Sequence, residues 1–311
     1  MSQATTAPLA PHRAAPALVR RRSKSAGTKW PVIVLFLPPA LLLFTIFVVL
    51  PMGEAAWYSF YNWSGYGLPT QWVGFRNYEL VFRNAAFRTA LINNGLIIVI
   101  SVLVQVPLAL WLATLASSKV KGVVTFRLIF FLPYVLADVA AGMIWRFVYD
   151  GDFGLVGGIA RFLGQQAPFP LADKGIAIYA VLGVVIWKYF GFHMMLFIAG
   201  LQSIDKNMLE AAEIDGATPV QKFLFVTLPA LASTVRLSVF FAVVGSLQLF
   251  DMIMPLTGGG PLNSTQTMVT YLYTFGVMRM QVGFGSAVGV VLFVICVTLA
   301  FGYKRIFMKN D

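Results

Sequence analysis

The chain has 311 residues, of which 59% are hydrophobic and only 11% are charged, and its mean hydropathy is +0.78. A soluble domain usually carries about 25% charged residues, so this composition excludes an ordinary soluble protein. One cysteine and two histidines also exclude an intrachain disulfide and an ordinary structural zinc site. The formal net charge of +11 would suit a nucleic-acid-binding protein, but its distribution along the chain indicates another cause.

Uninterrupted apolar stretches near 20 residues predict membrane-spanning helices. Six of them lie at about 30–51, 90–116, 122–149, 176–204, 229–256 and 283–307. Because lipid offers the backbone no hydrogen-bond partners, these segments must be helical. The predicted fold class is therefore all-α, a polytopic membrane protein with six transmembrane helices. The expected organisation is a basic, disordered segment over 1–29, a membrane domain over 30–307 and a short tail over 308–311.

Basic residues gather on one side of these spans if the six alternate in direction. This set is Arg13, Arg20, Arg21, Arg22, Lys24, Lys29, Lys119, Lys121, Arg127, Lys206, Lys222, Lys304, Arg305 and Lys309. The positive-inside rule then predicts that both termini and the 205–229 loop are cytoplasmic. The excess positive charge reflects membrane topology, with contact to anionic lipid as a minor addition, and we expect no nucleic-acid partner. The apolar run at 30–50 is too long for a signal peptide, so a retained first span is expected.

Three external segments are predicted between the spans. The first, 52–89, is rich in aromatic residues, which form either an interfacial belt or a platform for an external partner. The second, 149–175, is expected to contain a short helix around 155–163. The third, 257–282, opens with three glycines and a proline, which allow a tight re-entry of the chain. No Gly-Lys pair occurs in the sequence, so a Walker A phosphate loop is absent.

The segment 205–229 predicts two short helices separated by a break. Asp205 is placed to cap the first helix, and Gly216 to end it in a left-handed conformation. Thr218 begins the second helix with Pro219 at its first position and Gln221 completing a capping box. Pro229 suits the first turn of the following span.

The sequence of this segment resembles a known coupling motif. Glu210-Ala211-Ala212, three residues, Gly216, nine residues and then Val226-Thr227-Leu228-Pro229 resemble the cytoplasmic loop of binding-protein-dependent ABC importer permeases. Residues 72–78, 127–145, 199–217 and 256–261 resemble the sugar-importer branch of that family, the maltose and glycerol-phosphate type. The resemblance covers about 30–307, and one departure is Asp205, where the family often has proline. A generic amphipathic loop is the alternative interpretation of the segment.

The resemblance implies the type I importer architecture and a division of labour among subunits. Its partners would be a second homologous permease, a dimer of ABC ATPases, an extracytoplasmic solute-binding protein and a sugar substrate, in a prokaryotic inner membrane. ATP and Mg²⁺ would bind the partner ATPase, so this chain would be a transporter subunit and not an enzyme, with no cofactor of its own. The residues expected to couple it to the ATPase are Glu210, Ala211, Ala212, Glu213, Asp215 and Gly216. Glu213 alternatively belongs to a solvated helix face.

Polar residues inside spans are costly in lipid and usually face protein or a water-filled path. Carboxylate, amide, hydroxyl and aromatic side chains together suit a sugar. The candidates for a solute path are Asp138, Lys188, Tyr189, Phe192, His193, Ser246, Gln248, Leu249 and Asp251. Gln248 and Asp251 are expected to share a helix face with Gly245 and Leu249.

Several alternatives stay open. Lys188 either attracts an acidic sugar or forms a structural ion pair with Asp138 or Asp251. His193 alone is typical of a packing residue, and Asn93 and Asn94 are typical of polar contacts that join helices. At the level of function, the alternatives are a secondary transporter or channel, and an intramembrane hydrolase that would need an aspartyl pair from Asp138 and Asp251.

Overall fold

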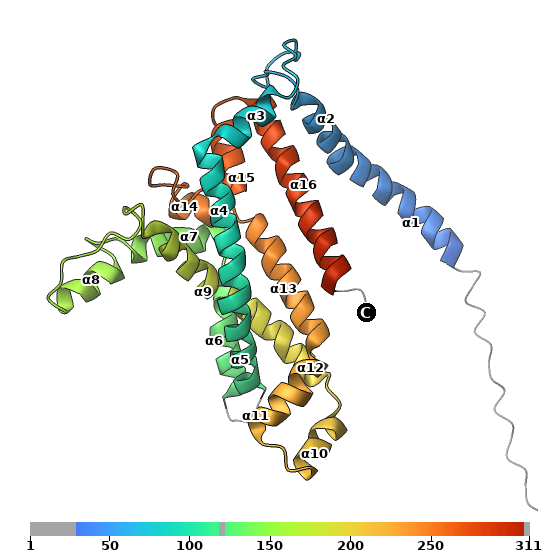
Figure 1. Ribbon diagram of the computed structural model, residues 1–311, viewed down its shortest axis with the longest axis vertical. Helices are drawn as coiled ribbons and strands as arrows, with labels where there is room; N and C mark the ends of the chain where they lie inside the picture. Colours follow the sequence, from blue (N-terminus) through green and yellow to red (C-terminus); the bar gives the residue numbers. More distant parts are fainter. Residues whose placement is uncertain (1–28, 118–121, 308–311) are drawn as a thin grey trace, which may run out of the picture. The chain divides into compact units, whose positions relative to one another are not determined.

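A computed structural model of the chain describes residues 29–117 and 122–307. Their regular structure is helical apart from one isolated β-bridge between Tyr61 and Trp72. The all-α prediction is confirmed (Figure 1). The expectations for 1–28 and for the tail 308–311 lie outside the described residues.

The contacts within the chain divide it into two compact units, Met1–Met52 and Gly53–Asp311. The first unit contains α1 (Lys29–Phe44), a π-helical turn, η1 (Thr45–Val49), and the start of α2 (Leu50–Tyr58). The predicted span 30–51 is thus the larger part of an apolar helix that extends over Val32–Tyr58. The described side chains from 32 to 52 are all exposed, so this helix offers an apolar surface suited to lipid on every side.

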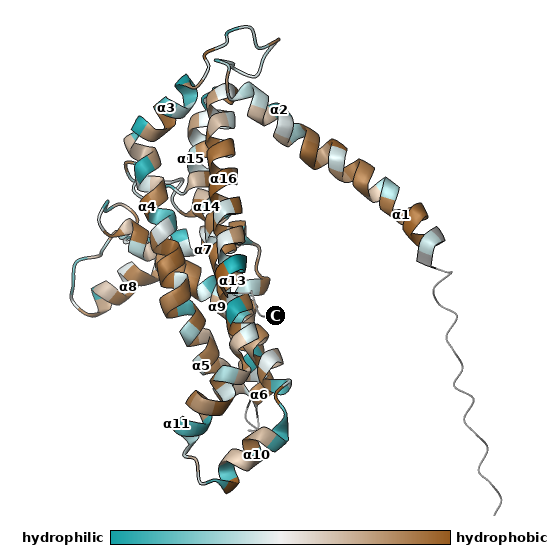
Figure 2. Ribbon diagram, turned by 45° about the vertical axis from the view of Figure 1, so that its right-hand side comes forward, coloured by the Kyte–Doolittle hydropathy of each residue, from teal (hydrophilic) through white to brown (hydrophobic). Residues whose placement is uncertain are grey.

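Three long helices of the second unit match predicted spans. A continuous helix of 32 residues combines α4 (Ala85–Ile100), η2 (Ser101–Gln105) and α5 (Val106–Ala116), while α9 (Ala177–Gln202) and α16 (Val282–Phe307) have 26 residues each. Hydrophobic residues dominate α5 and α16 (Figure 2). The predictions for 90–116, 176–204 and 283–307 are therefore confirmed as apolar helices long enough to cross a membrane.

The other two predicted spans are bent rather than continuous. The first is α6 (Val123–Val135) followed by α7 (Asp138–Val148), with an angle of 97° between them. The second is the helix Pro219–Ala230 followed by α13 (Ala232–Leu247), with an angle of 70°. The described part of the chain accordingly has four helices able to span a membrane, or up to six if each bent pair is one span.

The prediction of a single helix over 122–149 is wrong because the backbone becomes extended at Leu136 and Ala137, with ψ of 143° and 139°. Pro133 lies inside α6, and proline there removes a backbone donor and crowds the preceding turn. The last carbonyls of α6 thus lose their helical partners at the break, and the Lys188 ammonium bonds to them instead.

The prediction for 229–256 is also wrong in part. Helix α13 ends at Leu247, and a non-helical turn leads to α14 (Ile253–Leu256). Gln248 caps α13 and Asp251 lies in the turn, so they do not share a helix face. Pro229 lies at the end of the helix before the bend, not in the first turn of α13.

Short helices complete the second unit. They are α3 (Arg76–Arg83), α8 (Leu155–Phe162), α10 (Lys206–Ile214), α11 (Pro219–Lys222), η3 (Phe223–Thr227), α12 (Leu228–Ala230), α15 (Met268–Tyr271) and η4 (Leu272–Val277). The short helix expected around 155–163 is confirmed as α8. Within this unit, α3 and α15 lie at one end, and α10 and α11 lie at the other (Figure 1).

Two asparagines hold the loop between α14 and α15 in place. The Asn93 amide donates to the carbonyls of Ser264 and Gln266, both at 2.8 Å. Asn94 donates to the Ser246 carbonyl at 2.7 Å and accepts from the Met268 amide at 2.8 Å. The expectation that these residues join helices is confirmed for Asn94, which connects α4 to α13 and α15, while Asn93 binds the loop. The glycines at its start take left-handed conformations, with φ of 61° at Gly258 and 83° at Gly259, as a tight re-entry requires.

Aromatic side chains pack together at the end of α2 and in the segment after it. The Trp72 ring stacks on Phe60 with 5.4 Å between centroids and meets Tyr61 edge-on at 5.1 Å. Trp57 and Trp72 remain 55% and 56% exposed. Both the belt and the platform interpretations fit this half-exposed cluster.

The crossing of α6 and α9 depends on a glycine. A Cβ atom at Gly191 would collide with the Phe130 carbonyl oxygen and lie 3.0 Å from the Phe131 Cα. We therefore expect Gly191→Ala to destabilise the folded chain by about 1–3 kcal/mol, because backbone cannot move aside as a side chain does. Gly95→Ala in α4 is the matched control, since nothing lies within 4 Å of its Cβ position. Thermal unfolding of the two variants in detergent tests this, and equal stability of both would contradict it.

Candidate functional site

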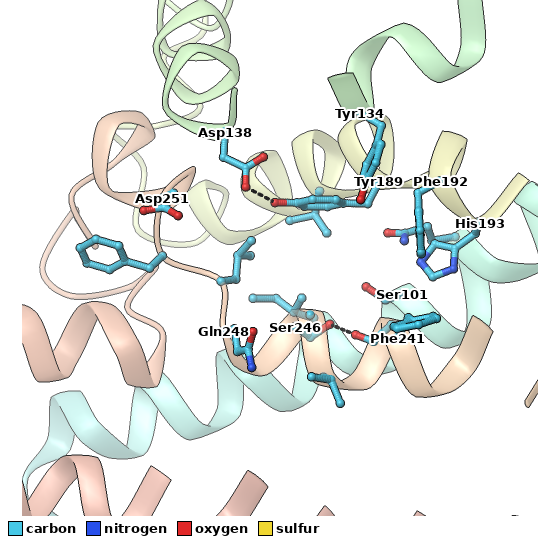
Figure 3. A pocket seen from close by; sticks show the side chains of 18 residues that line it. Ser101, Tyr134, Asp138, Tyr189, Phe192, His193, Phe241, Ser246, Gln248 and Asp251 are labelled. Atoms are coloured by element: carbon cyan, nitrogen blue, oxygen red, sulfur yellow. Dashed lines mark hydrogen bonds between the residues drawn. The ribbon is translucent and has the colours of Figure 1, made fainter. Parts of the chain in front are cut away.

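A cavity of about 690 Å³ lies within the second unit. Its walls come from the α4–η2 region, the α6–α7 break, α9, α13 and the turn that follows α13 (Figure 3). The break and the turn are the places where two predicted spans fail to be straight helices. The departures from the sequence prediction therefore shape the cavity.

Aromatic rings form much of its lining. Tyr134, from the end of α6, stacks on Phe192 of α9 with 5.1 Å between centroids and 28° between planes. Phe241 of α13 meets Phe192 edge-on at 5.6 Å, and Tyr189 lies one turn along α9 (Figure 3). Such faces suit the C–H surfaces of a sugar ring as well as ordinary apolar packing.

Polar groups are set between these rings. The Tyr189 hydroxyl donates to Asp138 Oδ2 at 3.1 Å. Ser246, Gln248 and Asp251 line the same cavity from the end of α13 and the turn after it (Figure 3). Tertiary folding thus brings together carboxylate, amide, hydroxyl and aromatic groups that are up to 113 positions apart, from Asp138 to Asp251.

The structure gathers all but one of the predicted solute-path residues around this cavity. Those that line it are Asp138, Tyr189, Phe192, His193, Ser246, Gln248, Leu249 and Asp251. His193 is buried, and its Nδ1 lies 2.8 Å from the Ser238 hydroxyl. It therefore has a protein partner on one side while it faces the cavity on the other.

Lys188 is the exception, since it is 1% exposed and does not line the cavity. Its ammonium donates to the carbonyls of Pro133 at 3.0 Å, Tyr134 at 2.9 Å and Leu136 at 2.5 Å. It also lies 3.1 Å from Asp138 Oδ1. The Lys188 ammonium lies at the C-terminal end of α6, which carries partial negative charge, and the Asp138 carboxylate lies in the first turn of α7, where the partial charge is positive. Each side chain therefore has the charge that its helix end favours.

These contacts give Lys188 a structural place in the chain. Its ammonium bonds to the carbonyls that the break between α6 and α7 leaves without helical partners. It also forms the ion pair with Asp138, which was one of the two pairings that the sequence left open. No ion pair joins it to Asp251 among the described residues. The carbonyl contacts had no signal in the sequence, because they join positions 52 to 55 residues apart.

Two buried polar residues of the lining were missed by the sequence argument. Ser101 and Gln105 lie in the π-helical turn η2, are 2% exposed each, and face the cavity. Their signal was available, since both are polar residues within an apolar span. The Gln105 side-chain oxygen has no hydrogen-bond partner within the described part of the chain.

The 205–229 segment forms a second feature, at the end of the unit opposite α3 (Figure 1). Asp205 accepts a hydrogen bond from the Asn207 amide at 2.9 Å, Gly216 has φ of 75°, and Thr218 and Gln221 form the capping box. These local predictions are confirmed. Hydrophilic and hydrophobic residues alternate along α10 and α11 (Figure 2).

The surface of α10 and α11 is largely exposed. Five of the six predicted coupling residues are exposed, namely Glu210, Ala211, Glu213, Asp215 and Gly216. Ala212 is buried, with 9% of its surface exposed. Glu213 forms an ion pair with Lys222, which ties α10 to the second helix. The Glu213 side chain remains 60% exposed, so the solvated-face interpretation also stays open. Apolar side chains are exposed beside these residues, including Met208 at 50%, Val220 at 66% and Ile214 at 86%.

Comparison with known proteins places the chain in a family. Residues 99–309 match the family described as "Binding-protein-dependent transport system inner membrane component". The chain belongs to this family. It is therefore a multi-pass component of the inner membrane.

Curated relatives agree over nearly the whole chain. The sulfoquinovosyl glycerol transport system permease protein SmoG of Agrobacterium fabrum is 32% identical over 279 residues, covering 89% of this chain and 91% of that protein. The diacetylchitobiose uptake system permease protein NgcF of Streptomyces coelicolor is 33% identical, covering 99% and 90%. The sn-glycerol-3-phosphate transport system permease protein UgpA of A. fabrum is 34% identical, covering 87% and 92%.

These relatives are permease proteins, which confirms that the permease described here is a transporter subunit rather than an enzyme. The crystal structure of a bacterial ABC transporter involved in the import of the acidic polysaccharide alginate is similar in fold. Its TM-score is 0.80 at 22% identity, and the match covers 91% of this chain and 96% of that chain. The fold prediction is confirmed by this match.

Proposed function

We propose that this chain is the permease subunit of an ATP-driven importer for a sugar or sugar derivative. Support comes from family membership and from relatives whose names describe transport of sugars and sugar derivatives. The observation that carries the proposal is the cavity, where aromatic faces and hydrogen-bonding groups meet inside a membrane domain. A hydroxylated ring needs both kinds of contact.

We further propose that α10 and α11 couple the chain to an ATPase. Exposed Glu210 and Asp215 offer negative charge to basic residues of a partner, and exposed Ile214 and Val220 offer apolar surface. The buried small side chain of Ala212 lets α10 seat closely on its own chain. ATP binding on the partner would then bias the permease between two states through this contact, because only a differential contact shifts such an equilibrium.

The proposed assembly contains a second homologous permease, an ABC ATPase dimer and an extracytoplasmic solute-binding protein. A similar fold occurs in a solved alginate ABC transporter complexed with a periplasmic protein that carries an alginate pentasaccharide. ATP and Mg²⁺ belong to the ATPase subunits in this proposal. Both termini and α10–α11 face the cytoplasm, with lipid around the apolar helices and the aromatic segment after α2 on the outside.

Within this proposal the cavity is the part of the solute path that this chain supplies. Tyr189, Phe192, Ser246, Gln248 and Asp251 are the residues expected to contact solute. Lys188 acts through the α6–α7 break and is a positioning residue. His193 and Leu249 complete the wall of the cavity.

Reconstitution of the complex tests the function. The chain is expected to copurify with the neighbouring ATPase, second permease and binding protein, and to import a sugar into liposomes only with ATP. Gln248→Ala is expected to slow import without loss of assembly, because it removes an amide from the cavity wall. A chain that purifies alone and transports along an ion gradient without ATP would overturn the proposal in favour of a secondary transporter.

A further inference from the structure

Two of the hydroxyl groups that line the cavity already donate their hydrogens within the chain. The Ser246 hydroxyl donates to the Ala242 carbonyl at 2.7 Å, and the Tyr189 hydroxyl donates to Asp138. The oxygen atoms of both hydroxyls keep lone pairs for a further bond. What remains on these side chains for a solute is therefore acceptor capacity.

A buried side chain adds to this. Gln105 is 2% exposed and lines the cavity, yet its carbonyl oxygen has no hydrogen-bond partner within the described residues. An unpaired buried acceptor is costly unless a donor reaches it. A hydroxyl or amine hydrogen from a solute would supply that donor.

The charged residues of the cavity also favour a solute that donates hydrogen bonds. Neither lysine nor arginine is found among the described residues that line it. Lys188 points its ammonium at Asp138 and at the carbonyls that end α6, so its charge balances groups within the chain. Asp251 is exposed, lines the cavity and forms no ion pair with any described residue. The donors left on the wall, such as the Gln248 amide and the Tyr134 hydroxyl, are neutral.

From these observations we infer that the cavity selects a hydroxyl-rich sugar that is neutral or carries an amine, and that it disfavours acidic sugars. This inference rests on the proposed function and adds the charge class of its substrate. A carboxylate, sulfonate or phosphate entering the cavity would meet acceptors and the unpaired Asp251 carboxylate, while an ammonium or hydroxyl would meet partners. Electron-rich aromatic faces also favour a cation or C–H surface over an anion.

The substrate panel is the first test. The complex with its ATPase, second permease and binding protein is reconstituted in liposomes and supplied with a neutral disaccharide, a glucosamine oligomer, an oligouronate and glycerol phosphate. We expect import of the neutral disaccharide or of the glucosamine oligomer, and not of the two acidic compounds. Import of the oligouronate or of glycerol phosphate would overturn the inference while leaving the proposed function intact. ATP-independent transport, or failure to assemble with an ATPase, would remove the proposed function itself.

Substitution of Asp251 is the second test. Asp251→Lys is expected to lower import of the transported sugar on the order of tenfold, because it replaces the unpaired acceptor by a donor of opposite charge. Asp251→Asn, which keeps an acceptor oxygen, should lose less. Asp152→Lys is the matched control, since Asp152 is exposed and does not line the cavity. Copurification verifies assembly of each variant, and unchanged or faster import by Asp251→Lys would overturn the inference.

Discussion

A chain carrying Glu210→Lys and Gly216→Val is expected to assemble with its partners but to lose ATP-driven import by roughly 5–150-fold, the range of an ordinary coupling free energy of 1–3 kcal/mol. The lysine reverses a charge on the exposed surface of α10. The valine opposes the left-handed backbone at Gly216, where φ is 75°, at a cost of about 1–2 kcal/mol. The turn between α10 and α11 would then lose its geometry while the membrane helices keep theirs.

A second variant distinguishes the effect of the left-handed backbone at Gly216 from the effect of added side-chain volume. No atom lies within 4 Å of the Cβ position at Gly216, so added volume meets no obstacle. Gly216→Asn is therefore expected to retain most import, because asparagine tolerates the left-handed region. The measurement is solute-stimulated ATP hydrolysis alongside import in liposomes. Full stimulation in the double variant would rule out this loop as the coupling element.

Lys188→Met is expected to destabilise the permease by about 3–5 kcal/mol, the usual result of removing one partner from a buried ion pair. The ammonium contacts the carbonyls of Pro133, Tyr134 and Leu136 together with Asp138, and the side chain is 1% exposed. Methionine fills similar volume but leaves these oxygens without a donor. The break between α6 and α7, and with it one wall of the cavity, would lose its main support.

Two comparisons make this result specific. Lys222→Met removes the exposed pair with Glu213 and is expected to cost no more than about 1 kcal/mol. Adding Asp138→Asn to Lys188→Met should recover part of the lost stability, since it removes the uncompensated charge. Unfolding in detergent, followed by heat or denaturant, gives the ranking. Equal stability of the Lys188 and Lys222 variants would show that the buried ammonium does not hold the break.

The sequence placed the solute-path residues near one another better than it described their backbone. Asp138, Gln248 and Asp251 line one cavity. The helix face that was meant to bring Gln248 and Asp251 together does not exist, because α13 ends at Leu247. The polarity of these residues within apolar segments was the reliable signal, since lipid penalises such groups wherever they lie. Their helical phase was not reliable, because a turn at Gln248 ends the periodicity.

Lys188 gives the opposite case. Its burial inside a span was readable from the sequence, yet its role depends on carbonyls that a straight helix would have used internally. Only the break at Leu136 and Ala137 releases those carbonyls, and only the packing of α9 against α6 brings the ammonium to them. The same packing keeps the lysine out of the cavity lining.

The sequence by itself determined the long apolar helices, the family and the caps of the α10–α11 segment. Each of these depends on composition or on bonds between residues a few positions apart, such as Thr218 with Gln221. The tertiary structure alone decided where two spans bend, which groups satisfy the bends and which side chains share the cavity. Those outcomes depend on contacts between distant segments, such as Lys188 with Pro133 and Asn94 with Met268, and no local pattern of residues encodes which distant partner will satisfy a given polar group.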